Sequence, residues 1–263
     1  MLPRILVIAG SDSSGGAGIQ ADIKTITMLG GYAMTAITAL TAQNTCGVQH
    51  ITITEPDMLS AQIDACVEDI GVDVIKTGMI PDAASLSIVR DTISRLQRPV
   101  VFDPVMVASS GATLQQAGLQ EALLDMLPLL EVITPNIPEA QTLTGLPIST
   151  REGMETAAQA LRAKGARAVV LKGGHLPGES VVDLLLTTEG PTWLEQPRIE
   201  TRHTHGTGCT LASAIATYLG LGHTLEQAVR HAQAYVYQAI ADAPGLGEGY
   251  GPLHHAHPLH ASG

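Results

Sequence analysis

Short apolar runs alternate with helical patterns along this chain. The runs cover residues 5–9, 33–40, 72–77, 100–103, 132–134 and 168–172. They are continuously apolar, which predicts strands covered on both faces in a parallel sheet. Between them, apolar residues recur at helical spacing in 20–29, 56–69, 81–96, 119–127 and 151–164. The pattern therefore predicts an α/β protein with a doubly wound, mostly parallel sheet.

Residues 181–201 break this alternation. Two stretches, 181–187 and 192–198, flank the turn Glu189-Gly190-Pro191 and predict a β-hairpin at the sheet edge. Helical patterns follow over 209–219 and 224–242. Ligands of doubly wound sheets bind beyond the carboxyl ends of the strands. We therefore expect functional side chains directly after the strands.

Composition narrows the class of protein. No shift in composition and no repeat divides the 263 residues, so we expect a single domain over 1–263. The formal net charge of −11 argues against nucleic acid and anionic membrane surfaces as partners, since both attract basic faces. No run approaches the roughly 18 apolar residues of a membrane span. Three cysteines without CxxC spacing argue against a disulfide framework or zinc site, and we expect a cytoplasmic protein.

The strongest local motif is Thr204-His205-Gly206-Thr207-Gly208-Cys209-Thr210, which opens an apolar helix. Backbone amides at a helix N-terminus bind anions, and glycines let the backbone approach closely. The motif predicts a site for a phosphoryl group, although similar turns also occur as plain connections. Cys209 lies where the helix dipole lowers a thiol pKa, so it is a candidate base; a small core residue is the alternative.

A second glycine-rich loop, residues 9–22, follows the first predicted strand. Gly16-Ala17-Gly18 lacks the third glycine of a dinucleotide fingerprint, because Ala21 stands there. No Walker A sequence occurs in the chain. The loop stays a candidate for ligand binding at a strand end.

Four polar residues follow three successive strands: Asp103, Asn136, Glu139 and Lys172. Asp103 and Glu139 could hold Mg²⁺ directly or through water, and Lys172 could neutralise a nucleotide phosphate. Each alone is more often a solvated loop residue, but their shared location supports a joint site. The histidines of 254–258 could indicate a metal site or tag, and we expect a surface tail instead.

These motifs together identify a resemblance to the bacterial hydroxymethylpyrimidine/phosphomethylpyrimidine kinases of the ribokinase-like superfamily. The resemblance is collinear and covers nearly the whole chain. The segments that carry it are 9–22 (AGSDSSGGAGIQAD), 39–47 (ALTAQNTCG), 76–79 (KTGM), 103–107 (DPVMV), 134–139 (TPNIPE), 172–175 (KGGH), 204–210 (THGTGCT) and 250–257 (YGPLHHAH).

The resemblance implies a three-layer α/β/α fold without a separate lid domain, and two successive ATP-dependent phosphorylations in thiamine biosynthesis. The first acts on 4-amino-5-hydroxymethyl-2-methylpyrimidine and the second on its monophosphate. The pyrimidine pocket would be lined by Gly10, Asp22, Gln43, Met79 and Val105. Gln43 offers a donor and an acceptor to an aminopyrimidine edge, and Met79 and Val105 supply apolar walls.

The resemblance also assigns the phosphate side of the site. Cys209 would be the base, and Gly206, Thr207 and Gly208 the anion hole. Lys172, Asn136 and Thr207 would contact ATP, and Glu139 with Asp103 would organise Mg²⁺. Many relatives carry lysine where this chain has Ser109 and Gln233, which affects the expected nucleotide contacts.

Two other functions remain open at this stage. A pyridoxal kinase of the same superfamily would use the same phosphate chemistry, but Gln43 and Met79 favour the aminopyrimidine. A pyrimidine-binding module without catalysis is disfavoured by Cys209 and the glycines around it. Relatives imply a homodimer.

Overall fold

The computed structural model describes residues 2–106 and 118–259, and within these ranges nine strands form one sheet in the order β3-β2-β1-β4-β5-β6-β7-β8-β9. The middle strands, from β2 to β7 in that order, pair in parallel, whereas β3, β8 and β9 are antiparallel to their neighbours. The mostly parallel sheet and the edge hairpin are thereby confirmed. The strands are β1 Arg4–Asp12, β2 Tyr32–Asn44, β3 Gly47–Ile53, β4 Val74–Thr77, β5 Val100–Phe102, β6 Val132–Ile133, β7 Val169–Leu171, β8 Ser180–Thr187 and β9 Gly190–Pro197.

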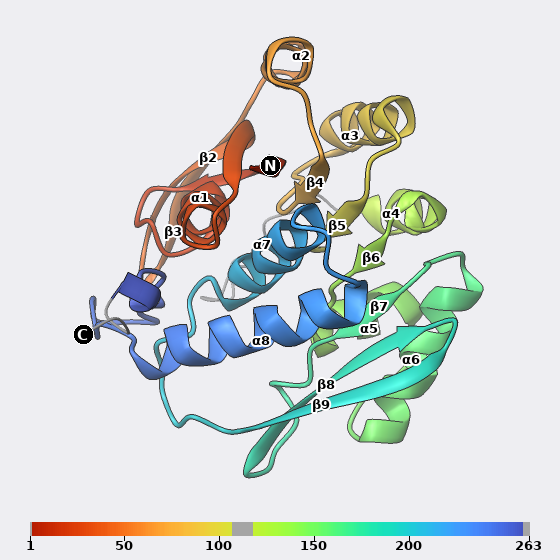
Figure 1. Cartoon of the computed structure of the whole chain (residues 1–263), viewed down its shortest axis with the longest axis vertical. Helices are drawn as coiled ribbons and strands as arrows, with labels where there is room; N and C mark the ends of the chain where they lie inside the picture. Colours follow the sequence, from red (N-terminus) through yellow and green to blue (C-terminus); the bar gives the residue numbers. More distant parts are fainter. Residues whose placement is uncertain (1, 107–117, 260–263) are drawn as a thin grey trace.

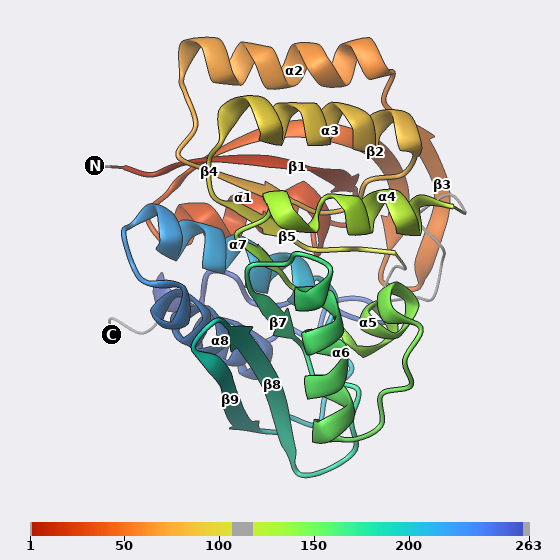
Figure 2. The same ribbon diagram turned by 90° about the vertical axis from the view of Figure 1, so that its right-hand side faces the viewer.

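Helices cover both faces of this sheet, which gives the expected three layers (Figures 1 and 2). Helices α2 to α6 pack on one face, while α1, α7 and α8 pack on the other. They are α1 Gly18–Met28, α2 Pro56–Asp69, α3 Ala83–Leu96, α4 Leu119–Asp125, α5 Ile137–Thr144, α6 Arg151–Ala163, α7 Thr207–Gly220 and α8 Leu225–Ala241, with short 3-10 helices η1 Leu127–Leu129 and η2 His257–Leu259.

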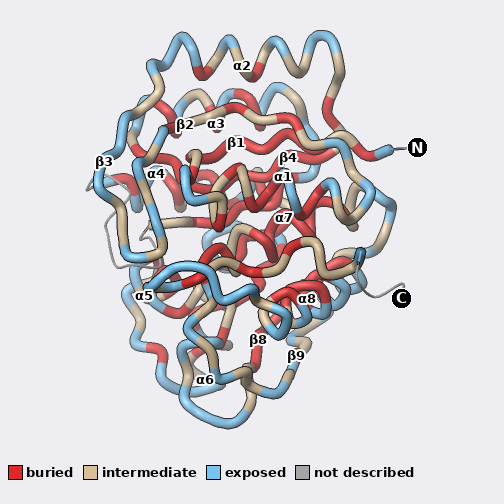
Figure 3. The backbone as a smooth tube through the Cα atoms, turned by 90° about the vertical axis from the view of Figure 1, so that its left-hand side faces the viewer, coloured by how far each residue is buried: buried red, intermediate tan, exposed pale blue. Residues whose placement is uncertain are grey.

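The continuous apolar runs are explained by these two cores. In β1, Leu6 and Ile8 point into the core under α2–α6, whereas Ile5 and Val7 point into the core under α1, α7 and α8. Successive side chains of a strand face opposite ways, so a strand between two helical layers needs apolar residues at every position. Figure 3 shows the resulting burial of β1 and α7 at the centre of the molecule.

The hydrophobic pattern of the sequence does not predict two of the elements. Strand β3 extends the sheet beyond β2 but is exposed over most of its length, so it carries no apolar run. Helix α5 has only eight residues and is set by a capping box, in which Asn136 accepts from the Glu139 amide and Glu139 accepts from the Asn136 amide. A short helix fixed by its cap leaves little periodic signal.

The order of the strands fixes where ligands can bind. The chain passes from β1 to β2 on one side and then crosses to β4, so β1 and β4 flank the point at which the strand order reverses. Crevices at such points are the ligand sites of doubly wound sheets. No separate lid domain occurs in the described ranges, and none of the helices in them has the length and apolar character that crossing a membrane requires.

Candidate active site

A cavity of about 790 Å³ lies beyond the carboxyl ends of the parallel strands. It is lined by every residue that the sequence predicts for the site except Asp22: Gly10, Gln43, Met79, Val105, Asp103, Asn136, Glu139, Lys172, Gly206, Thr207, Gly208 and Cys209. Residues from seven separate segments of the chain therefore meet in one space. The cavity is large enough for a nucleotide and a small acceptor side by side.

The loop after β1 is organised by Asp12, which the sequence analysis did not single out. Its carboxylate accepts hydrogen bonds from the amides of Ser14, Gly16 and Ala17 at 2.8–3.1 Å, and its Oδ2 lies 2.8 Å from Nε2 of His205. Burial opposes ionisation of Asp12, but the hydrogen bonds from His205, from the Ser14 hydroxyl and from the amides of Ala17 and Ser14 outweigh it and lower its pKa. An aspartate just before Ser-Ser-Gly-Gly is typical of such side-chain-capped turns, and that signal was available.

The two glycine-rich loops dock backbone to backbone. Gly206 has φ +86°, and a Cβ built there would lie 1.9 Å from the carbonyl oxygen of Gly16. A Cβ on Gly16 would lie 2.4 Å from Cδ2 of His205. Glycine is therefore required at both positions by close approach, and at Gly206 also by the left-handed backbone.

The residues that begin helix α7, Thr207, Gly208 and Cys209, line the cavity next to these loops. The first hydrogen bond of the helical ladder runs from the Thr210 amide to Gly206 O at 2.9 Å. The Thr207 amide donates to Thr204 O at 3.2 Å, so it is engaged within the turn. The amides of Gly208 and Cys209 precede the ladder, as expected for the first turn of a helix, and they are the donors best placed for an anion.

The predicted lowering of the Cys209 pKa is wrong. Burial raises the pKa of this thiol to about 12, although Lys76 and the Gly18 backbone oppose the rise. The residue lies at the N-terminus of α7 as expected, but removal from water and the nearby carboxylates of Asp22 and Asp103 outweigh the helix dipole. Cys209 is therefore a protonated thiol at neutral pH.

Asp22 lies below the cavity and does not line it. Both of its carboxylate oxygens accept from Nζ of Lys76, at 2.9 and 3.0 Å, and Oδ1 also accepts from Oγ of Ser213 at 2.6 Å. Neither side chain of the ion pair is exposed at all. Burial alone would lower the pKa of Lys76, but Asp22, and then Cys209 and Asp103, raise it. Lys76, another residue missed from the sequence, thus carries a fixed positive charge beneath Cys209.

On the phosphate side, Nζ of Lys172 donates to Asp103 Oδ1 at 2.9 Å. A Cβ on Gly208 would lie 3.1 Å from this nitrogen, so the ammonium group lies directly at the start of α7. Burial alone would lower the pKa of Lys172, but Asp103 and Glu139 outweigh it and raise it. Burial raises the pKa of Glu139 to about 7, with Lys172 opposing the rise and Asp103 adding to it.

Within the described ranges no cluster of three or more His, Cys, Asp or Glu side chains is arranged to hold a metal. Asp103 and Glu139 nevertheless fit a divalent cation that keeps several waters and phosphate oxygens as ligands, which is the habit of Mg²⁺. The two buried carboxylates face a single lysine, Lys172, and a cation would relieve the excess negative charge. Asn136 contributes the cap of α5 and thereby orients Glu139.

The acceptor side of the cavity combines polar and apolar walls. Gln43 lies with its Nε2 3.5 Å from Nε2 of His205, and its Oε1 accepts from Thr41 Oγ1 at 3.1 Å. Met79 packs against Gly10, where an added Cβ would approach Met79 Cε to 3.2 Å. The Val105 amide donates to the backbone carbonyl of Asp103 at 2.8 Å, which fixes the apolar wall next to this residue.

The two departures from the relatives' lysines have different outcomes. Ser109 lies outside the described residues. Gln233 lines the cavity, and its Nε2 donates to Asp183 Oδ2 at 2.5 Å. Burial raises the pKa of Asp183, and the amides of Gly173 and Gln233, followed by the charge of Lys172, oppose the rise.

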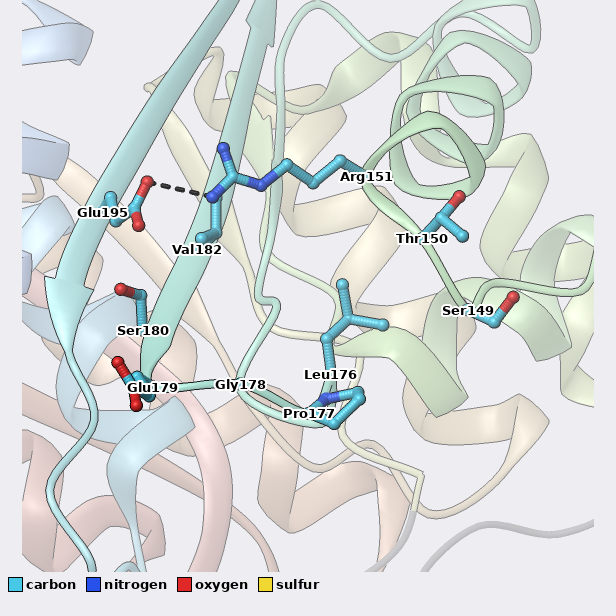
Figure 4. Close-up of a pocket in the computed structure, with 10 residues that line it drawn as sticks. All are labelled: Ser149, Thr150, Arg151, Leu176, Pro177, Gly178, Glu179, Ser180, Val182 and Glu195. Atoms are coloured by element: carbon cyan, nitrogen blue, oxygen red, sulfur yellow. Dashed lines mark hydrogen bonds and ion pairs between the residues drawn. The ribbon is translucent and has the colours of Figure 1, made fainter.

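A second cavity, of about 430 Å³, lies between the N-terminus of α6 and the β8–β9 hairpin (Figure 4). Its one ion pair joins Arg151 to Glu195 at 2.9 Å, and both side chains are half exposed. None of the predicted site residues lines it. The chemistry therefore gathers in the larger cavity.

Comparisons with known proteins agree with this geometry. The model of a family described as phosphomethylpyrimidine kinase matches residues 12–254. A hydroxymethylpyrimidine/phosphomethylpyrimidine kinase of Rhizobium meliloti is 46% identical over 96% of both chains. A thiamine biosynthesis bifunctional protein of Geobacter sulfurreducens is 49% identical over 95% of this chain, which spans 52% of that longer protein.

Solved structures give the same fold. Bacillus subtilis pyridoxal kinase, determined as an ADP complex, superposes with a TM-score of 0.90 at 37% identity and covers 98% of this chain and 100% of its own. A phosphomethylpyrimidine kinase of Clostridium difficile superposes with a TM-score of 0.80 at 37% identity, over 91% of this chain and 100% of its own. The ribokinase-like architecture expected from the sequence is confirmed.

Proposed function

Because the chain belongs to the phosphomethylpyrimidine kinase family, we propose that it phosphorylates 4-amino-5-hydroxymethyl-2-methylpyrimidine with ATP and then phosphorylates the monophosphate to the diphosphate. One observation carries this proposal. Apart from Asp22, the residues expected to bind the pyrimidine and those expected to bind phosphate line the same cavity, at the switch point of the sheet. The two reactants would thus meet over the first turn of α7.

The amides of Gly208 and Cys209 would receive the phosphoryl group as it moves. Charge on its equatorial oxygens grows in a loose transition state, and amides that are already aligned stabilise it without reorganising. Lys172 adds a cation at the same place, because its ammonium lies against Gly208. When bound, Mg²⁺ would neutralise phosphate charge, with Asp103 and Glu139 as its protein-side partners.

The proposed role of Cys209 as base has to accommodate its raised pKa. A thiol with a pKa of about 12 is protonated at neutral pH, so it would first act as a hydrogen-bond partner that orients the acceptor hydroxyl. Cys209 could accept the proton of the acceptor hydroxyl only after it had lost its own thiol proton. Loose phosphoryl transfer needs little help from a base before bond cleavage to the leaving group, so positioning is the larger contribution.

Steady-state kinetics on wild type and Cys209→Ala test the role of Cys209. We expect a loss on the order of 10²-fold in kcat, in line with the cost of a misplaced acceptor hydroxyl. Full phosphoryl transfer by Cys209→Ala would remove the residue from the base role.

Product analysis with the pyrimidine alcohol and Mg-ATP tests the whole proposal. We expect monophosphate to form first and diphosphate to accumulate later. A protein that binds the pyrimidine without consuming ATP would be a binding module and would overturn the proposal.

Pyridoxal kinase is the second candidate, and the structural likeness favours it: the TM-score with the Bacillus subtilis pyridoxal kinase exceeds that with the Clostridium difficile phosphomethylpyrimidine kinase. Gln43 and Met79 favour the aminopyrimidine, since the amide can pair with its donor–acceptor edge. Comparing kcat/KM for the two alcohols decides between them, and a clear preference for pyridoxal would overturn the first choice.

We also propose a homodimer in which each subunit is a single domain over residues 1–263. The single nine-stranded sheet of the described residues supports the one-domain part. Light scattering after size exclusion would give about twice the chain mass of 27.4 kDa for a dimer, and the chain mass itself would rule the dimer out.

A further inference from the structure

The C-terminal segment, residues 249–257, is built into the molecule. The sequence predicted a surface tail here, and that prediction is wrong for His255, which is only 4% exposed. In Figure 1 the dark blue segment beyond α8 turns back toward the ends of β2 and β3, and the Tyr250 amide donates to Thr45 O at 2.9 Å. The segment therefore has packing partners on several elements, and one of them is the start of α7.

Two backbone contacts join the segment to the glycine-rich turn. The His205 amide donates to Gly251 O at 3.1 Å, and His205 forms a parallel bridge with Pro252. On the other side, Tyr235 of α8 donates its hydroxyl to His255 O at 2.6 Å. His255 is thus held between α8 and the first turn of α7.

The His255 ring contacts that first turn through Thr210. Its Nε2 lies 3.0 Å from Thr210 Oγ1, and this hydroxyl donates to Gly206 O at 2.8 Å. Gly206 O also accepts the Thr210 amide at 2.9 Å, so Thr210 holds the carbonyl by two bonds. A threonine hydroxyl has one proton, and if it donates to Gly206 then the imidazole must donate to it.

Burial lowers the pKa of His255 to about 4, so the ring carries a single N–H at neutral pH. In the alternative tautomer the proton is on Nδ1, toward the Leu253 carbonyl. Nε2 is then an acceptor, and the Thr210 hydroxyl would have to donate its proton to His255. The 2.8 Å contact between Thr210 Oγ1 and Gly206 O would then join two oxygens with no proton between them, which is repulsive. The Nε2–H form keeps both hydrogen bonds of the Thr210 hydroxyl and gives up the one to the Leu253 carbonyl.

We propose that His255 is a positioning residue for phosphoryl transfer: through Thr210 it fixes the Gly206 carbonyl, the acceptor that closes the first turn of α7, and hence the turn that carries the Gly208 and Cys209 amides. The inference rests on the proposed role of these amides as the anion hole. Gly206 has a left-handed backbone at this point, so its peptide planes depend on the partners of its carbonyl. A small misplacement of aligned donors is costly, on the order of 10²-fold in rate per ångström.

The test uses the full-length enzyme in three variants. His255→Leu removes the ring nitrogen, and His255→Gln restores an N–H donor. His257→Leu is the matched control, because His257 belongs to the same segment but contacts Tyr235 O on α8, at 3.1 Å. We expect His255→Leu to lower kcat on the order of 10- to 100-fold with little change in KM for the acceptor, His255→Gln to recover part of the loss, and His257→Leu to stay near wild type.

Equal losses in His255→Leu and His257→Leu would mean that the segment only supports the fold, and the inference would be overturned. So would a kcat of His255→Leu within threefold of wild type. A second measurement does not depend on activity: long-range ¹H–¹⁵N NMR of the histidine rings should show the Nε2–H tautomer for His255. The Nδ1–H tautomer would refute the hydrogen-bond chain, whereas an inactive wild type with the expected tautomer would refute the proposed function instead.

Discussion

The buried pair of Lys76 and Asp22 gives the sharpest prediction about stability. Replacing Lys76 with methionine keeps most of the length of the side chain but leaves the Asp22 carboxylate without its cation at a site with no exposure. Two hydrogen bonds to Asp22 are lost, and the one from Ser213 remains. Breaking one side of a buried pair costs about 3–5 kcal/mol, so we expect that loss in the free energy of unfolding at pH 8.

The loss should depend on pH, and its sign follows from Asp22. Burial already raises the pKa of Asp22 in the wild type although Lys76 opposes the rise, and removing Lys76 raises that pKa further. A carboxyl group whose pKa is higher in the folded than in the unfolded state favours folding at low pH, and this advantage is lost as the pH rises toward the folded value. Lys76→Met should therefore be much closer to wild type at pH 5 than at pH 8.

Urea unfolding of four proteins measures both effects. Wild type, Lys76→Met, Asp22→Asn and the double variant form a double-mutant cycle, in which we expect a coupling energy of about 2 kcal/mol or more at pH 8. In the double variant, the free energy of unfolding should no longer show the extra pH dependence that Lys76→Met introduces. As a control, Arg230→Met breaks the half-exposed pair with Glu226 on α8 and should cost at most about 0.5 kcal/mol.

The reasoning fails if Lys76→Met costs less than about 1 kcal/mol at pH 8, or if its cost is the same at both pH values. The same variants test the predicted contact of Asp22 with the pyrimidine. Because Asp22 lies below the cavity, we expect Asp22→Asn to change stability much more than KM for the acceptor. A large rise in KM in a fully folded variant would restore Asp22 to the pocket.

Three further predictions concern the loops around the cavity. Glu139→Gln keeps the capping acceptor but removes a carboxyl group whose pKa is raised to about 7. Without Mg²⁺, the variant should therefore unfold at a higher urea concentration than wild type at pH 8, and this difference should vanish below about pH 4.5. Equal urea midpoints at pH 8 would contradict this. Gly206→Ala should cost several kcal/mol in a thermal melt, because its Cβ would meet Gly16 O, whereas Gly222→Ala, with φ +90° and open space, should cost only about 1 kcal/mol; similar costs would refute the clash. Asp12→Asn replaces a carboxylate that accepts backbone N–H groups with an amide. Because the pKa of Asp12 is lowered in the folded state, the variant should be less stable than wild type above about pH 4 and equally stable well below that pH. A loss of stability that is the same at every pH would argue for packing alone.

Much of the fold follows from local sequence. Strands with apolar residues at every position imply helices on both faces, and short connections imply a parallel order, so the layers and the edge hairpin could be predicted. Strand β3 could not, because its side chains are mostly exposed and its place depends on pairing with β2. Helix α5 could not either, because its cap and not its periodicity defines it.

Some features of the candidate site could likewise be predicted from the sequence, and others could not. Sequence by itself determined the glycines of the α7 turn and the polar residues at the strand ends, since these roles depend on local backbone geometry. Only the tertiary structure decided that Asp22 pairs with Lys76 below the cavity, that Cys209 is a protonated thiol, and that His255 packs under the turn. Each of these depends on burial and on charges brought from distant parts of the chain, and no local pattern carries that information.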